Sequence, residues 1–98
     1  MTNVPRVLVV GYHAYDTIVP VRGPVPPDAK HEVERFFEGG GGPGATAAVA
    51  LRRLGAAVRL YSPLTDDGPG RRQRRELEVA GVDLTGCPVV AGAASPRA

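Results

Sequence analysis

Several residue types are scarce in this 98-residue chain, and each scarcity excludes a class of protein. Tryptophan is absent, and Cys87 is the only cysteine, so no disulfide can form within the chain. We interpret Cys87 as a small buried residue rather than a nucleophile. No apolar run approaches the roughly 20 residues of a transmembrane helix, and we expect no membrane partner. The apolar run 7–10 is too short for a secretion signal, so the expected location is the cytoplasm.

Charge of one sign is also scarce. The formal net charge is +2 and Lys30 is the only lysine, so the balance is too mild to predict nucleic acid as a partner. Four arginines and two glutamates between residues 71 and 78 are typical of a solvated helix face. Asp66 and Asp67 fit a capped turn before that helix better than a metal site, and we expect no bound metal ion.

Glycine, by contrast, is abundant, and residues 39–46 read Gly-Gly-Gly-Gly-Pro-Gly-Ala-Thr ahead of an apolar helical pattern. Glycines at a helix entrance let a ligand approach backbone N–H groups. Gly39, Gly41 and Gly44 match the dinucleotide fingerprint G-x-G-x-x-G. The match is weak, because a charged segment precedes it where the fingerprint needs an apolar strand. A Walker A loop is excluded because Ala45 stands at its lysine position.

A third interpretation pairs the glycine run with Asp16. The apolar run 7–11 predicts a central strand of a parallel sheet, and Asp16 follows it at the mouth of the sheet, where ligands bind in α/β folds. A carboxylate can accept hydrogen bonds from two hydroxyl groups of a polyol. A local Asx-turn would explain Asp16 equally well. We interpret the neighbouring His13 as a surface or hydrogen-bonded loop residue rather than an acid–base group.

The hydrophobic pattern predicts an α/β layer in which strands and helices alternate. The expected strands are 7–11, 57–61 and 88–91, and the expected helices are 45–54 and 71–80. Gly55 and Gly81 follow the two helices, at the position where a left-handed glycine ends a helix. The C-terminal tail, residues 93–98, has no pattern of a closing element.

Two segments between the first strand and the glycine run are harder to assign. Residues 17–21 have β-propensity, but Pro20 confines them to a sheet edge. From the local pattern alone, residues 29–38 fit a helix capped by Asp28 slightly better than a strand.

Four blocks in this order resemble the N-terminal part of the ribokinase (PfkB) family of carbohydrate kinases. The strand 7–11 followed by Asp16 is similar to the family's opening strand and sugar-binding aspartate. The run 41–55, with its paired glycines and terminal Arg-Leu-Gly, is similar to the first family signature. Residues 66–70 (Asp-Asp-Gly-Pro-Gly) and 81–83 (Gly-Val-Asp) are similar to two later family blocks. The resemblance extends over most of the chain.

The resemblance implies a ribokinase-like α/β fold, with a Rossmann-type, mostly parallel sheet, helices and a small β-lid. Residues 1–98 would form the N-terminal part of one carbohydrate kinase domain. The lid strands are expected at about residues 17–21 and 31–38, which replaces the helix that the local pattern favours at 29–38. The paired glycines would be the hinge between the lid and the body.

By the same resemblance, Asp16, Gly41, Gly42 and Thr46 line the sugar site. Ala14 and Thr46 stand where many sugar kinases carry asparagine, which implies a substrate with fewer or differently placed hydroxyl groups than ribose. The family's catalytic Gly-x-Gly-Asp motif, anion hole and ATP pocket lie beyond the matching segment. We therefore expect no catalytic residue in this chain.

The activity implied by the resemblance is ATP-dependent phosphorylation of a sugar hydroxyl, with ATP and Mg²⁺ as cofactors of the full-length enzyme. We expect this chain alone to bind neither cofactor and to be inactive. The expected partners are a small-molecule sugar or polyol and, through the lid, a second copy of the chain in a homodimer. The alternatives are a nucleotide-binding module or a lid-mediated dimerisation module without catalysis.

Overall fold

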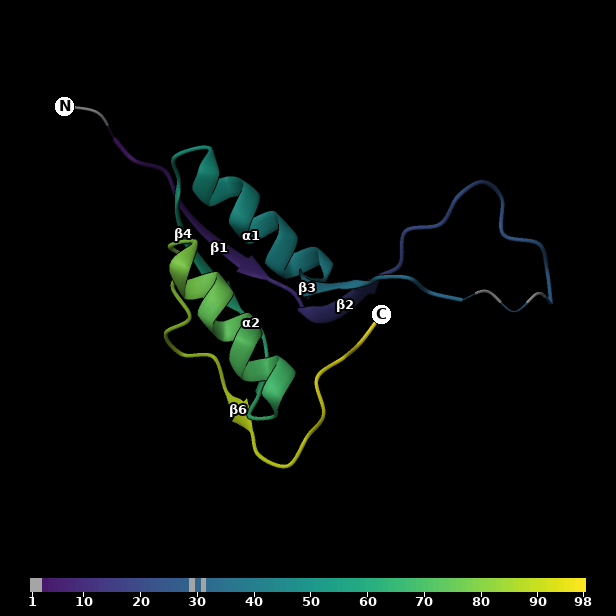
Figure 1. Cartoon of the computed structure of the whole chain (residues 1–98). Coiled ribbons are helices and arrows are strands. Elements are labelled where there is room, and N and C mark those ends of the chain that lie inside the picture. Colours follow the sequence, from purple (N-terminus) through teal and green to yellow (C-terminus); the bar gives the residue numbers. More distant parts are fainter. Residues whose placement is uncertain (1–2, 29, 31) are drawn as a thin grey trace.

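The computed structural model describes residues 3–28, 30 and 32–98, which form a helix-covered pair of strands with a projecting ribbon (Figure 1). The parallel pair consists of β1 (Arg6–Val10) and β4 (Ala57–Tyr61). The ribbon consists of the antiparallel strands β2 (Ala14–Ile18) and β3 (Phe37–Gly41). This arrangement confirms the predicted α/β class, in which a mostly parallel layer carries a separate small β-element.

One face of the parallel pair carries the core, and the other is open. Val7 lies opposite Val58 and Val9 opposite Leu60 in the register of β1 and β4. Val58 and Leu60 are buried, and the two valines of β1 pack against the same core. The next residue on the other face, Leu8, is 61% exposed. Parallel sheets are usually covered on both faces, whereas the described residues cover only one face of this pair of strands.

Helix α1 (Pro43–Arg53) begins two residues before its predicted start and packs Ala45 and Ala48 against the sheet. Leu54 caps its C-terminus, and the following Gly55 has a φ of 99°. A glycine in the left-handed region is the predicted helix stop, and it is confirmed. The next strand, β4, coincides with its predicted residues.

The ribbon strands differ from their predicted positions. β2 begins at Ala14 rather than at residue 17, and β3 occupies residues 37–41 rather than 31–38. Residue 31 lies outside the described residues, and residues 32–36 form neither helix nor strand. The physical reason is pairing: β2 bonds to the glycine run, and this partner overrides the low strand propensity of glycine. Asp16 therefore lies inside a strand and not in a loop.

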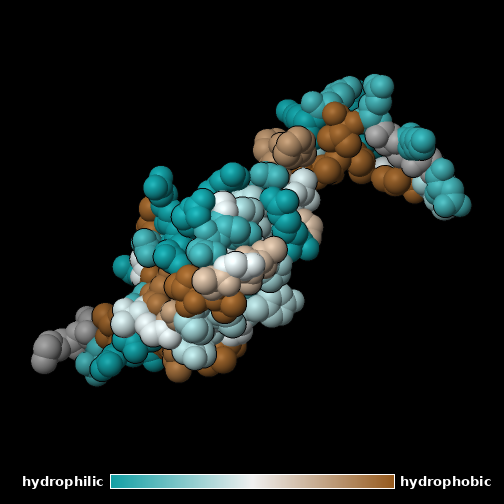
Figure 2. Space-filling model, turned by 90° about the horizontal axis from the view of Figure 1, so that it is seen from below, coloured by the Kyte–Doolittle hydropathy of each residue, from teal (hydrophilic) through white to brown (hydrophobic). Residues whose placement is uncertain are grey.

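Residues 19–28 and 32–36 connect the two ribbon strands and form an arm that extends away from the body (Figure 2). Apolar side chains gather on this arm and on the adjoining ends of the strands, and exposed ones include Ile18, Val19, Val21, Phe36 and Phe37.

Helix α2 (Gly68–Val79) starts from Asp67, whose carboxylate accepts a hydrogen bond from the Gly70 amide at 3.0 Å. The same carboxylate accepts bonds from the Thr65 hydroxyl (2.7 Å) and from the Ser95 amide and hydroxyl (2.8 and 2.7 Å). These donors, led by the Ser95 hydroxyl, hold the pKa of Asp67 well below its usual range. The predicted capping role of Asp67 is confirmed, and this residue also ties α2 to the C-terminal tail.

The tail completes the ribbon, although no closing element is expected there from the sequence. The Tyr15 amide donates to the Pro96 carbonyl at 2.8 Å, and the Thr17 amide donates to the Ala98 carbonyl at 2.7 Å. β2 is thus bonded on both sides, by β3 and by the tail. Nearby, β5 (Leu64–Thr65) and β6 (Val89–Val90) form a short parallel pair. β6 lies inside the predicted strand 88–91, whereas no strand is expected at β5.

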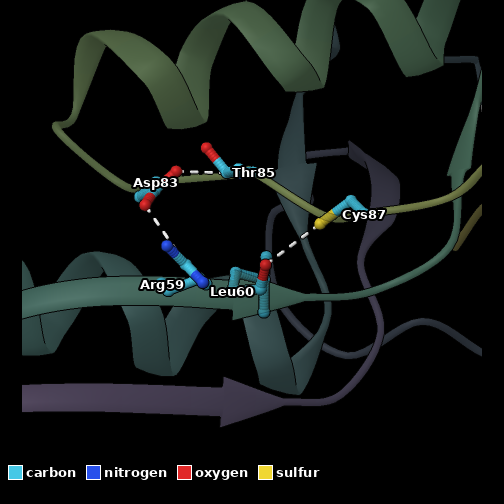
Figure 3. A network of polar contacts seen from close by, with 5 residues as sticks. All are labelled: Arg59, Leu60, Asp83, Thr85 and Cys87. Carbon is cyan, nitrogen blue, oxygen red and sulfur yellow. Dashed lines mark hydrogen bonds and ion pairs between the residues drawn. The ribbon is translucent and has the colours of Figure 1, made fainter.

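A polar network ties the segment after α2 to β4 (Figure 3). Arg59 forms an ion pair with Asp83 at 3.2 Å, and Asp83 accepts a hydrogen bond from the Thr85 amide at 2.8 Å. The Leu60 amide donates to the Asp83 carbonyl at 3.0 Å, which extends the parallel sheet by one bridge. The Cys87 thiol donates to the Leu60 carbonyl at 3.0 Å. Cys87 is half-buried and not fully buried as expected, and its thiol makes this structural contact.

Neither α1 nor α2 nor any other helix among the described residues combines the length and the apolar character needed to cross a membrane.

Truncation of a side chain should lower the free energy of unfolding much more on the covered face of the sheet than on the open face. Leu60→Ala should lower the free energy of unfolding by about 2–5 kcal/mol, because Leu60 is fully buried and the change leaves a cavity. Leu8→Ala, in the neighbouring strand but on the open face, should cost about 1 kcal/mol or less. Urea unfolding followed by circular dichroism measures both. Equal losses for the two variants would contradict this assignment of the faces.

The bonds to Asp67 predict an acid-sensitive element. Because its pKa is lower in the folded chain than in the unfolded chain, the stability it contributes is present above about pH 4 and is lost as the pH falls further. Asp67→Asn should therefore be less stable than the parent at pH 7, and the difference should shrink towards pH 3. Urea midpoints at pH 7, 5 and 3 test this. A difference that stays constant with pH would show that the charge of Asp67 does not matter.

Candidate functional site

The Asp16 carboxylate lies against the backbone of Gly41 at the base of the ribbon. Asp16 is half-buried in β2, and Gly41 is buried at the end of β3. A Cβ atom added at Gly41 would overlap the carboxyl group of Asp16. Only glycine leaves room for this approach. The structure thus brings together the two features that the polyol interpretation pairs, the Asp16 carboxylate and the glycine run.

Gly42 turns the chain from β3 into α1 and requires glycine for two reasons. Its φ is 90°, in the left-handed region. A Cβ atom there would lie 2.8 Å from both the Ala14 amide nitrogen and the Cα of His13. The two connections between the body and the ribbon, at 13–14 and at 42, therefore touch one another. This is the position that a hinge between lid and body would occupy.

The N-terminus of α1 is closed rather than open to a ligand. The amides of Gly44 and Ala45 donate to the Tyr12 carbonyl at 3.1 and 3.4 Å, and the Thr46 amide donates to Gly42 within the helix at 2.9 Å. Pro43 has no N–H group. The backbone donors that a dinucleotide or P-loop interpretation needs are thus already used. The expectation that this helix entrance exposes free amides is therefore wrong for residues 44–46.

Thr46 and Ala14 differ in their relation to Asp16. Ala14 is buried in β2 and pairs with Gly41 across the ribbon. Thr46 is exposed on α1 and lines a groove of about 390 Å³ between α1 and α2, whose lining residues do not include Asp16. Four of the five predicted site residues therefore gather at the base of the ribbon, and Thr46 faces the neighbouring groove.

Of the two alternatives expected for His13, the structure confirms the hydrogen-bonded loop residue and not the surface residue. His13 is 2% exposed, and its Nδ1 atom lies 3.0 Å from the Ser62 hydroxyl. Burial lowers the pKa of His13, against an opposing effect from the nearby Asp67 charge. Burial therefore favours the neutral imidazole, and its bond to Ser62 fixes the connection between β1 and the ribbon.

The sequence interpretation missed the role of α2. Its arginine-rich stretch reads as a solvated face, but Arg72, Gln73 and Glu76 each bond to the ribbon. One residue could have indicated this role from the sequence. Gln73 lies four positions before Leu77 and so shares the buried face of the helix with it. A polar residue on such a face indicates a specific hydrogen bond.

Across residues 3–28, 30 and 32–98, the structure contains no group of three or more His, Cys, Asp or Glu side chains arranged to hold a metal ion. Asp67 caps α2, and the adjacent Asp66 carboxylate accepts a hydrogen bond from the Gly92 amide at 3.3 Å.

Comparisons with known proteins give relatives along nearly the whole chain. It is 35% identical over 85 residues, or 87% of its length, to an ATP-dependent ribose-1-phosphate kinase of Halopiger xanaduensis. It is 31% identical over 93% of its length to a nucleoside kinase of Methanothermobacter thermautotrophicus. In structure, 95% of the chain superimposes on a ribokinase of Cryptococcus neoformans in complex with ADP, with a TM-score of 0.71 and 29% identity.

The chain spans 29% of the length of each of these three proteins. The match to the ribokinase structure confirms the ribokinase-like fold. The model of the pfkB family of carbohydrate kinases matches residues 4–98. Since this match covers almost every residue, the chain belongs to the pfkB family of carbohydrate kinases.

Proposed function

We propose that this chain is the N-terminal part of an ATP-dependent kinase that phosphorylates a hydroxyl group of a sugar or nucleoside, and that it supplies part of the substrate site. The observation that carries the proposal is the contact between the Asp16 carboxylate and the Gly41 backbone. A carboxylate held beside a bare strand can accept hydrogen bonds from two neighbouring hydroxyl groups. No side chain at Gly41 stands between the strand and a ring that binds there.

We infer the substrate class from the family and from the side chains at positions 14 and 46, of which only Ala14 lies beside Asp16. A kinase for ribose 1-phosphate and a nucleoside kinase are among the relatives. Ala14 and Thr46 offer no amide group, so they make fewer hydrogen bonds to hydroxyls than asparagine would. We therefore propose a substrate that this part of the site recognises chiefly through Asp16, with Gly41 and Gly42 shaping the contact.

We further propose that ATP and Mg²⁺ bind to parts of the full-length enzyme outside this chain, which would supply and activate the phosphoryl group. Two observations support this division. The amides of residues 44–46 at the start of α1 already donate to carbonyl groups. The described residues also contain no cluster of carboxylates that could share a metal ion. The chain's own contribution is then to bind and orient the acceptor, which is a large part of catalysis in phosphoryl transfer.

Substitution of Asp16 tests the proposal. Asp16→Asn should weaken binding of D-ribose or adenosine about 10- to 100-fold, because it removes a charge-assisted hydrogen bond of about 1.5–3 kcal/mol. Asp28→Asn, which removes the same charge from the arm, should leave binding unchanged. Titration of the 98-residue chain, followed by NMR, measures both affinities. Binding that is indifferent to Asp16, or phosphorylation of either compound by this chain with ATP and Mg²⁺, would contradict the proposal.

We also propose a homodimer formed through the ribbon. Exposed apolar residues lie on the projecting arm and the strand ends, where the body does not cover them (Figure 2). β3 is bonded to β2 along one edge, and on its other edge α2 occupies the Gly40 amide through Glu76, which leaves residues 37–39 of that edge for a second strand. A second copy offers both a matching apolar face and a matching edge.

Analytical ultracentrifugation tests the dimer. Ile18→Asp, which places a charge in the apolar part of the ribbon, should weaken dimerisation about tenfold or more, since an unpaired charge is costly to bury. Leu8→Asp is the control, because Leu8 is also in a strand and is about equally exposed (61% against 59%) but lies on the open sheet face. A monomeric parent chain, or a dimer disrupted only by the Leu8 variant, would contradict the ribbon as the interface.

A further inference from the structure

We propose that α2 positions the glycine strand: Glu76 and Gln73 hold the backbone of Gly40 and Gly41 so that Gly41 and Asp16 keep their mutual position. This proposal rests on the proposed function, because it assigns a helix outside the predicted site to the geometry of that same site. Glu76 and Gln73 are positioning residues in this account, since they act through the strand.

The ribbon presents its two faces to different parts of the molecule. Side chains alternate along a strand, so Asp16 and Tyr15 lie on opposite faces of β2. The register places Gly40 opposite Tyr15 and Gly39 opposite Asp16. Gly41, two residues beyond Gly39, shares the Asp16 face. Gly40 shares the face of Tyr15, which is the face that α2 contacts through Arg72.

From the side of that second face, α2 reaches the outer edge of β3 and bonds directly to the glycine backbone. The Gly40 amide donates to the Glu76 carboxylate at 2.9 Å, and Gln73 Nε2 donates to the Gly41 carbonyl at 3.1 Å. A Cβ atom at Gly40 would lie 2.7 Å from Glu76 Oε2 and 3.1 Å from Gln73 Nε2. The space that a side chain would need at Gly40 is occupied by α2. Two adjacent glycines thus serve opposite faces, one for Asp16 and one for the helix.

The burial of Gln73 indicates that its bond is specific. Gln73 is 1% exposed and lies on the buried face of α2 with Leu77. Its Oε1 atom is buried and has no hydrogen-bond partner among the described residues. An unpaired buried polar atom costs roughly 1–3 kcal/mol. An apolar residue at position 73 would avoid that cost, but it could not bond to Gly41. The bond from Nε2 to the Gly41 carbonyl is therefore what distinguishes glutamine from an apolar residue at this position.

Arg72 adds a link from α2 to both strands. Its guanidinium lies 5.8 Å from the centre of the Tyr15 ring in β2 and 3.6 Å from the Glu38 carboxylate in β3. Contacts at such an exposed position are individually weak. Their effect is geometric, because they fix the ribbon to the helix at a second point beyond Gly40 and Gly41.

Glu76 is the residue to substitute, because it is exposed and its loss leaves the core intact. Glu76→Ala removes the acceptor for the Gly40 amide, whereas Glu76→Gln keeps an oxygen in the same place. Glu78→Ala is the matched control, since it removes the same charge from an exposed position of the same helix. Glu78 is not one of the three α2 residues, Arg72, Gln73 and Glu76, that bond to the ribbon. Urea unfolding of all three variants checks that global stability is comparable.

Two readouts on the 98-residue chain then decide the proposal. In Glu76→Ala, hydrogen exchange of the Gly40 amide should become about tenfold faster, and the Kd for D-ribose or adenosine should rise about five- to tenfold. Glu76→Gln should restore both to within about twofold of the parent, as expected when an acceptor is kept. Glu78→Ala should change neither.

Unchanged Gly40 exchange in Glu76→Ala would overturn the proposal, and so would faster exchange with unchanged affinity, since the helix would then have only a structural role. Failure of both compounds to bind the parent chain would contradict the proposed function itself. Binding by the parent with equal affinity in every variant would contradict only the positioning role of α2.

Discussion

The arrangement of the site depends on a short stretch of backbone that carries no side chains. At Gly41 the missing Cβ makes room for the Asp16 carboxylate, and at Gly40 it makes room for Glu76 and Gln73. A glycine strand loses more conformational entropy on folding than other strands and buries no side chain of its own. Its stability must come from what lies against it, and here that is β2 on one edge and α2 on one face.

The connection between body and ribbon is equally restricted. Gly42 and the backbone at 13–14 pass within van der Waals contact, and His13 is anchored by Ser62. The start of α1 is closed by the Tyr12 carbonyl. These contacts occupy the amides of residues 44 and 45 that a phosphate group would need, in line with the proposed role in binding the acceptor. The family of the chain, which is one of carbohydrate kinases, is consistent with that role.

Much of the body could be predicted from the sequence, because its signals are local. The apolar pattern of residues 57–61 and the glycine at position 55 specify β4 and the end of α1 without knowledge of distant partners. The ribbon could not be placed, because its strands are defined by pairing and not by propensity. Gly39 and Gly40 are poor strand formers by themselves and become a strand only opposite Asp16 and Tyr15.

The geometry of the candidate site was predictable to a similar extent. The acidic residue and the glycines were identified by their types, and the structure brings Asp16 and Gly41 into contact. The contribution of α2 was hidden, because an arginine-rich helix has the same composition whether it faces solvent or another strand. Burial of Gln73 distinguishes the two cases, and burial is a property of the tertiary structure.

The bonds between β2 and the tail have a consequence for the order of folding. Tyr15 is bonded to Pro96 and Thr17 to Ala98, so β2 acquires its second neighbour from the far end of the chain. Closing so long a loop is entropically costly and slow compared with forming α1 on β4, which needs only nearby residues. During synthesis the helical body can therefore assemble first. The ribbon reaches its final form only after residues 96–98 have left the ribosome.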